Sequence, residues 1–211
     1  MFASALAHRG VAALFVIMPY YGPRCDPESK VRMVSADPEQ TVRGMKQAIK
    51  DIRYAAAWLA AQPEVDSSQL GVFGISLGGI TASLAAEAEP RFQKVCPVLA
   101  GGGVGKILWE SNEPHMVQAR EKWLAAGGTR ESLLELMKTI DPANYGDRML
   151  GRKILMLNAD HDEVIPKACT EALWQAFGRP KIQWYHAGHY SAAWYLPIAI
   201  ATVTEFFAGT P

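Results

Sequence analysis

The chain has 211 residues, 49% of them hydrophobic, which is enough for one α/β domain with a core of useful size. Its 21 basic and 21 acidic residues give a formal net charge of zero, which argues against nucleic acid or an anionic membrane as the main partner. No continuous apolar run reaches the length of a membrane span, and the chain does not open with a signal-peptide pattern. The three cysteines are widely spaced without a CxxC pair, which argues against a disulfide framework or a structural zinc site.

The N-terminal segment reads as the end of a helix followed by a strand. The pattern predicts that Phe2 to Arg9 form the last turns of a helix, which Gly10 ends in a left-handed conformation. Val11 to Tyr20 is almost entirely apolar, a pattern typical of a parallel strand buried on both faces. A long loop to about Ala36 follows. Two of its residues are candidates for substrate contacts, Tyr21 and Arg24, although the role of a solvated loop arginine is favoured for Arg24.

A long amphipathic helix is predicted next. Asp37 is its expected N-cap and Pro38 its first residue. Apolar residues then recur every three or four positions until the helix ends before Pro63.

The stretch from Gln69 to Gly79 organises the rest of the chain. It runs from β-forming residues into a Gly-x-Ser-x-Gly turn at positions 74–78, and a helix from Ile80 to Glu89 follows. This pattern predicts a nucleophile elbow, a sharp strand-to-helix turn that holds Ser76 in a strained conformation. The flanking glycines at 74 and 78 are expected because a Cβ there would collide with the neighbouring strand or helix. The amide of Leu77 is expected to face an oxyanion.

The next strand is expected at Val95 to Ala100, and Gly101 to Gly103 is interpreted as a flexible exit at the mouth of the site. From about Lys106 to Leu150 the chain is helical and irregular. An insertion of this size is where a lid would lie, with aromatic residues lining an acyl pocket. Ordinary packing of these helices against the core is the alternative.

Two further strands deliver acidic and histidine side chains at their C-terminal ends. Lys153 to Asn158 leads to Asp160 and Asp162, and Lys181 to Tyr185 leads to His186 and His189. Helices are expected at 167–177 and 191–207. Strands that alternate with helices predict a parallel sheet covered on both faces, with its active edge at the strand C-termini.

The order serine, aspartate, histidine along the chain is that of the α/β-hydrolase fold. With G-I-S-L-G-G at 74–79, D-P-A-N-Y at 141–145, L-N-A-D-H-D-E-V-I-P at 157–166 and H-A-G-H-Y at 186–190, the sequence resembles the α/β-hydrolase superfamily. The nearest branches are the dienelactone-hydrolase-like and the acetyl-esterase or prolyl-oligopeptidase-like ones. The resemblance implies a triad of Ser76, Asp162 and His189, because the family acid stands three residues before Ile-Pro and the family base follows a glycine. Asp160 and His186 are the alternatives.

The resemblance also implies a reaction. We expect a serine hydrolase that acts on small-molecule esters without a metal or organic cofactor. The carboxylesterase type is favoured because dienelactone hydrolases usually carry cysteine where Ser76 stands. A peptidase or thioesterase with the same triad is one alternative, and a non-catalytic binding protein with this fold is another.

The first three strands of the superfamily sheet have no counterpart in the chain, so the resemblance implies an N-terminally incomplete fold with a gap at the sheet centre. Truncation from a larger parent is the favoured explanation. The alternatives are a second copy or a partner chain that completes the sheet, and direct pairing of the two strands beside the gap.

Overall fold

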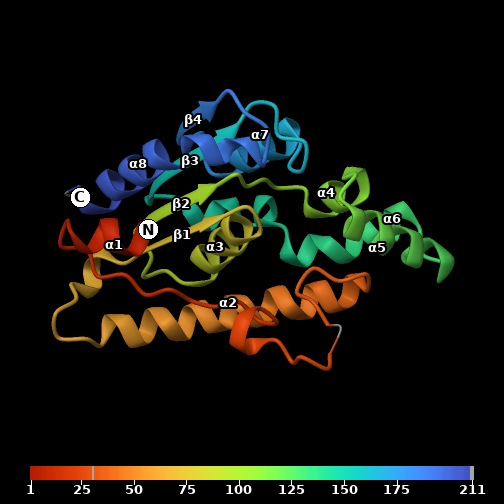
Figure 1. Cartoon of the computed structure of the whole chain (residues 1–211), viewed down its shortest axis with the longest axis horizontal. Coiled ribbons are helices and arrows are strands. Elements are labelled where there is room, and N and C mark those ends of the chain that lie inside the picture. The colour runs from red at the N-terminus through yellow and green to blue at the C-terminus, as the bar shows by residue number, and fades with distance from the viewer. Residues whose placement is uncertain (30, 210–211) are drawn as a thin grey trace.

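A computed structural model describes residues 1–29 and 31–209, which form a four-stranded parallel sheet with helices on both faces (Figure 1). The strands, in the order in which they lie side by side, are β1 (Gly71–Ile75), β2 (Lys94–Val98), β3 (Lys153–Ala159) and β4 (Lys181–Tyr185). The α-helices are α1 (Phe2–Ala7), α2 (Pro38–Ala60), α3 (Leu77–Ala88), α4 (Val104–Glu110), α5 (Pro114–Ala125), α6 (Arg130–Met137), α7 (Lys167–Ala176) and α8 (Leu196–Ala208). All three strand pairs are parallel, so the predicted α/β class is confirmed.

The two faces of the sheet have separate cores because successive strand residues point in opposite directions. On β3, Ile154 and Met156 belong to a large core that also contains buried residues of α2, α3 and α7. Leu155 and Leu157 belong to a smaller core with α8, against which Phe2 of α1 packs. Burial on both faces explains why the β2 and β3 sequences are nearly continuous apolar runs.

Residues 11–20 do not form the buried strand that their sequence predicts. No residue in this range is assigned to a strand, and Leu14 and Phe15 are 42% and 83% exposed. A buried strand needs a hydrogen-bonding neighbour, and among the described residues the sheet ends at β1. The prediction is therefore wrong: hydrophobicity alone cannot form a strand where no ladder partner is present.

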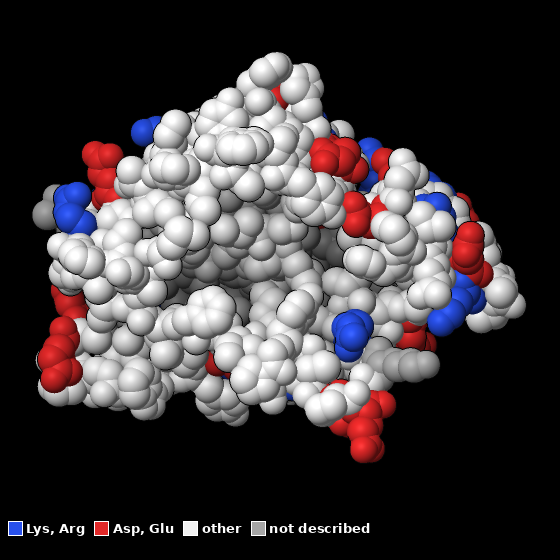
Figure 2. Space-filling view, in the orientation of Figure 1, with Lys and Arg blue, Asp and Glu red and all other residues white. Residues whose placement is uncertain are grey.

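The outer edge of the sheet is correspondingly open. Every residue of β1 is at least partly exposed, and Ile75 is 41% exposed. Figure 2 shows a deep hollow in the middle of this face, over the region where Figure 1 draws β1 and α3, with charged side chains kept to the periphery.

The chain leaving β2 is packed rather than flexible, which corrects the interpretation of the triple glycine. A Cβ on Gly101 would lie 2.9 Å from the backbone of Cys169, and one on Gly102 would lie 2.5 Å from the Ala143 side chain. Gly103 has φ of 70° and is the N-cap of α4. Gly101 and Gly102 allow α7 and the segment before β3 to approach this part of the chain closely. Gly103 allows the left-handed backbone conformation at the N-cap of α4.

The last helical stretch of the described chain is strongly apolar. By length and composition alone, Ser191–Ala208 is one candidate membrane span among the described residues. The stretch joins a short 3₁₀ turn, Ser191–Tyr195, to α8, and it is not a continuous apolar run because Thr202, Thr204 and Glu205 lie within it. In the fold, α8 packs against α1 and the sheet through Ala199 and Val203.

Candidate active site

Ser76 lies at the turn between β1 and α3 in a strained backbone conformation. Its φ of 55° and ψ of −121° are unusual for a residue with a side chain. The strain is held by hydrogen bonds on both sides of the residue: the Ser76 amide donates to the Val98 carbonyl at 2.8 Å, and the Ser76 carbonyl accepts from the Gly79 amide at 2.8 Å. This geometry is that of a nucleophile elbow, which keeps the hydroxyl clear of its own backbone.

Two glycines make the tight turn sterically feasible, and they are not quite the pair that the sequence suggested. A Cβ on Gly74 would overlap the carbonyl group of Gly78 in α3. A Cβ on Gly79 would lie 2.9 Å from the Ala100 Cβ. At Gly78 itself the nearest atom is the Met18 Cε at 3.9 Å, so a side chain there has room. The close packing thus depends on Gly74 and Gly79.

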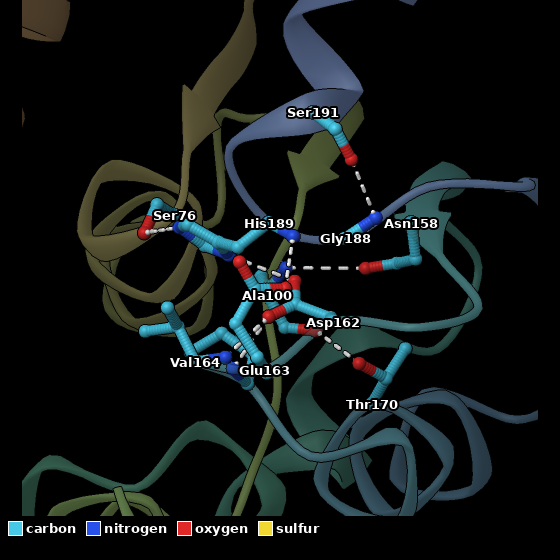
Figure 3. Close-up of polar contacts among 11 residues, drawn as sticks. Ser76, Ala100, Asn158, Asp162, Glu163, Val164, Thr170, Gly188, His189 and Ser191 are labelled. Atoms are coloured by element: carbon cyan, nitrogen blue, oxygen red, sulfur yellow. Dashed lines mark hydrogen bonds and ion pairs between the residues drawn. The ribbon is translucent and has the colours of Figure 1, made fainter. Parts of the chain in front are cut away.

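His189 bridges the serine and a buried carboxylate (Figure 3). Its Nε2 is 2.9 Å from the Ser76 Oγ, and its Nδ1 is 2.8 Å from the Asp162 Oδ2. The side chains of His189 and Asp162 are 9% and 3% exposed. The second carboxylate oxygen of Asp162 accepts the amides of Val164 and Ile165 at 2.9 and 2.7 Å, which fixes the carboxylate. The structure thus brings together the three side chains that the resemblance singles out.

A further carboxylate, missed by the sequence analysis, holds the histidine loop. The Glu163 Oε2 accepts the backbone amide of His189 at 2.8 Å, and a Cβ at Gly188 would overlap that carboxylate. The Ser191 hydroxyl accepts the Gly188 amide at 2.8 Å. The signal available in the sequence was the glycine before His189, whose lack of a side chain lets Glu163 approach.

The floor of the site is formed by the end of β2 and its neighbours. The buried Asn158 Oδ1 accepts the Ala100 amide at 3.1 Å, and the Thr170 hydroxyl donates to the Ala100 carbonyl at 3.1 Å. These bonds tie the chain after β2 to β3 and α7 just beneath the triad (Figure 3).

Of the residues expected to bind an oxyanion or substrate, Leu77 follows Ser76 directly. It is the first residue of α3, where backbone N–H groups have no intrahelical acceptor and the helix dipole is positive. The other two expected residues lie in the loop before α2. The Tyr21 amide donates to the Met18 carbonyl at 3.2 Å. The Arg24 guanidinium pairs with Asp51 and with the Ile17 carbonyl, both at 2.7 Å.

An apolar cavity of about 80 Å³ opens beside Ser76 and Leu77. Its walls come from α2 and the loop before it, from α3, from the loop after β3 and from the segment between β2 and β3. The lining residues are Val34, Thr41, Met45, Ile80, Val104, Ile107, Leu108, Met116, Met137, Ile140, Val164 and Ile165. Tyr21 and Arg24 are absent from this lining, taken over the part of the chain that the structure describes. Aliphatic and thioether side chains thus form the surface next to the hydroxyl.

The helical segment between β2 and β3 contributes to the cavity, but not through the expected aromatic residues. Ile107, Leu108 and Met116 of α4 and α5 line it. Trp109 and Trp123 pack against the main core instead, and the Trp123 indole donates to the Thr129 carbonyl at 2.9 Å. Helix packing and pocket lining therefore occur together in this segment.

The alternative acid and base form a second pair on the same loops. The His186 Nδ1 is 3.0 Å from the Asp160 Oδ2, with side chains that are 79% and 30% exposed. The hydrogen bond to His186 is the main reason that the pKa of Asp160 lies below its usual value. Among the described residues, the Ser76 hydroxyl bonds to His189 and not to His186, so the geometry pairs Ser76 with His189 and Asp162.

A parallel sheet with a serine at a nucleophile elbow, followed by an acid and a histidine at later strand ends, defines an α/β-hydrolase. Within that class, the chain belongs to the prolyl oligopeptidase family, whose family model matches residues 43–191. The matched segment includes the elbow, the acid loop and the histidine loop.

Two curated relatives come from Mycobacterium tuberculosis, strains CDC 1551 and H37Rv. Both are uncharacterised proteins, 31% identical to this chain over 192 residues. The match covers 85% of this chain and 42% of each relative, so the chain spans less than half the length of these proteins.

Solved structures support the fold. Acetyl xylan esterase 1 from Thermoanaerobacterium is 24% identical, with a TM-score of 0.62, over 83% of this chain and 57% of the esterase. TT1662 from Thermus thermophilus is 19% identical, with a TM-score of 0.69, over 100% of this chain and 82% of that one. A puromycin-hydrolyzing peptidase from Mycobacterium tuberculosis is 17% identical, with a TM-score of 0.63, over 77% and 25% of the two chains.

Proposed function

We propose that the chain acts as a serine hydrolase on carboxylic esters with short acyl groups, through an acyl-serine intermediate. The observation that supports this most is the unbroken relay from the Ser76 Oγ to the His189 Nε2 at 2.9 Å and from the His189 Nδ1 to Asp162 at 2.8 Å. Such distances lie within hydrogen-bond reach, which a nucleophile and its general base require.

The proposed chemistry follows from these groups. Neutral His189 accepts the Ser76 proton while the oxygen attacks the ester carbonyl carbon, and Asp162 stabilises the imidazolium that forms. The Leu77 amide receives the developing oxyanion. The alcohol leaves with the proton from His189. Water then attacks the acyl-serine with His189 again as base, and the carboxylic acid is released.

The cavity argues for a small acyl group. An engineered apolar cavity of about 150 Å³ holds a benzene molecule, so one of about 80 Å³ fits an acyl chain of only a few carbons. Its lining offers dispersion contacts and few polar partners, which suits an alkyl chain better than a charged one.

Ester cleavage is favoured over amide cleavage by the oxyanion site. Only the Leu77 amide is assigned to it among the described residues, and each missing donor costs roughly 10² to 10³ in kcat. An ester, with its better leaving group, tolerates this loss more readily than an amide does. A peptidase or thioesterase that uses the same three side chains is the second candidate, because one structural neighbour is a puromycin-hydrolyzing peptidase.

An esterase panel run on the wild type beside Ser76→Ala tests the proposal. We expect hydrolysis of p-nitrophenyl acetate to exceed that of p-nitrophenyl octanoate and of aminoacyl p-nitroanilides, and Ser76→Ala to abolish all of it. Preference for the anilides would favour the peptidase. A folded wild type with no activity above Ser76→Ala would favour a non-catalytic binding protein.

A further inference from the structure

Three side chains of types that can ligate a metal ion lie together beside the loops that carry Asp162 and His189. Asp160, His161 and His186 place one donor atom each within 4.8 Å of one another. The His186 Nδ1 is 3.0 Å from the Asp160 Oδ2, and the His161 Nε2 is 3.8 Å from the Asp160 Oδ1. The two imidazole rings lie edge to face, with centroids 4.7 Å apart.

These spacings fit a small divalent ion. Zinc binds histidine nitrogen and carboxylate oxygen at roughly 2.0 to 2.2 Å, so neighbouring ligands in a tetrahedral site lie about 3.3 Å apart. The N···O distances of 3.0 and 3.8 Å bracket that value. The His161 and His186 side chains are 64% and 79% exposed, so small rotations that bring both nitrogens onto one ion meet little resistance.

The backbone beneath the three side chains is fixed more firmly than the side chains themselves. The Asp160 amide donates to the Tyr185 carbonyl at 3.0 Å, and the His161 amide donates to the Ala187 carbonyl at 3.0 Å. The Ala187 amide in turn donates to the Asp160 Oδ1 at 3.2 Å, a bond that orients the carboxylate. Ligands on strand ends held in this way resemble the arrangement of metal sites whose outer hydrogen bonds orient the ligands.

We propose that Asp160, His161 and His186 form a binding site for a divalent transition ion of the zinc class, open to water at its remaining position. Two imidazoles and one carboxylate suit zinc, nickel, cobalt or copper better than calcium or magnesium. The ion joins the loop after β3 to the loop after β4, and therefore clamps together the loops that carry Asp162 and His189.

Isothermal titration calorimetry of the purified full chain with zinc chloride tests this proposal independently of catalytic activity. We expect one ion per chain. Each of His161→Ala, His186→Ala and Asp160→Asn is expected to weaken binding by about tenfold or more, because even the loss of an outer partner typically costs 10- to 100-fold. Zinc at 100 times its Kd is expected to raise the Tm of the wild type by about 5 to 10 °C.

Three control variants locate the ion. His115→Ala removes an exposed histidine on α5, Cys25→Ser removes the partly exposed thiol, and His189→Ala removes the histidine bonded to Ser76. All three are expected to bind zinc as the wild type does. Loss of binding in any of them, or equal binding by the wild type and His186→Ala, would overturn the proposal. Because His161 and His186 are exposed, their variants are expected to keep the metal-free Tm of the wild type, which separates lost ligation from misfolding.

Discussion

Two aspartate–histidine pairs, Asp162–His189 and Asp160–His186, join the loop after β3 to the loop after β4. Their N···O distances are nearly equal, at 2.8 and 3.0 Å. Their surroundings differ: the first pair is buried and its histidine faces Ser76, whereas the second is exposed and faces His161. Burial strengthens a charge-assisted bond and fixes its geometry, while exposure leaves ligands free to move. The third partner and the burial, not the aspartate–histidine contact itself, thus decide which chemistry a pair supports.

Removing each histidine in turn gives the largest contrast. His189→Ala is expected to lower kcat for p-nitrophenyl acetate by about four to six orders of magnitude, because it removes the general base. His186→Ala is expected to change kcat by less than about twofold, since an exposed pair contributes little. Steady-state kinetics on both variants measures the contrast. Equal losses would mean that the exposed pair participates in the chemistry.

Replacing Asp162 is expected to lower kcat much more than replacing Asp160, as for the two histidines. Asp162→Asn should lower kcat by about 10⁴, because the amide no longer holds the required histidine tautomer or stabilises the imidazolium. Asp160→Asn should leave kcat within about twofold of the wild type. Steady-state kinetics on both variants measures the difference, and an unchanged Tm of Asp162→Asn shows that its loss of rate does not come from unfolding.

Glu87 is a buried carboxyl group that, unlike the two aspartates, has no histidine partner in the part of the chain that the structure describes. Both oxygens of Glu87 lack a hydrogen-bond partner among the described residues, and burial raises its pKa to about 9. The folded protein therefore holds this proton at pH values where the unfolded chain has lost it. Its contribution to stability is complete below about pH 4.5 and is lost as the pH rises towards 9.

Glu87→Gln replaces the neutral acid with an uncharged group of similar shape. At pH 8 we expect the free energy of unfolding of the variant to exceed that of the wild type by about 1 kcal/mol or more, so that it unfolds at a higher urea concentration. At pH 4.5 we expect little difference. Urea denaturation at pH 4.5, 6 and 8 measures the trend. An advantage that does not grow with pH would show that Glu87 is ionised in the folded state.

The smallest effect is expected at the carboxylate that holds the histidine loop. Glu163→Ala removes the acceptor for the His189 amide, a bond whose exposed position makes it worth about 1 kcal/mol. We expect kcat to fall by about five- to tenfold with KM nearly unchanged. Glu163→Gln keeps an acceptor oxygen and should recover most of the rate. No rescue by Gln would show that the charge, rather than the hydrogen bond, matters.

Much of the fold follows from the sequence because local signals agree with packing. The alternation of apolar strands and helices, the Asp37 cap of α2 and the strand at Lys181–Tyr185 all match the structure. Residues 11–20 do not, because a strand requires a neighbour and apolar composition cannot supply one. Whether a segment pairs is a property of the whole sheet rather than of its own residues.

The site was predictable in part for a related reason. The elbow motif and the family spacing select Ser76, Asp162 and His189, which the structure brings within hydrogen-bond distance. Glu163 has no motif, and its contact with the His189 amide appears only when two loops meet in space. Likewise Arg24, expected either to contact substrate or to be a solvated loop arginine, is paired with Asp51 on α2, a contact across 27 positions that no local pattern encodes.

The central claim is that Ser76 is an activated nucleophile, and a fluorophosphonate probe tests it most directly because it needs no knowledge of the substrate. Peptide mass spectrometry after incubation at pH 7.5 is predicted to find the adduct on Ser76 of the wild type, and none on Ser76 of His189→Ala at the same probe concentration and time. Intact, folded wild-type protein that carries no adduct on Ser76, or equal labelling of the two proteins, would contradict the account.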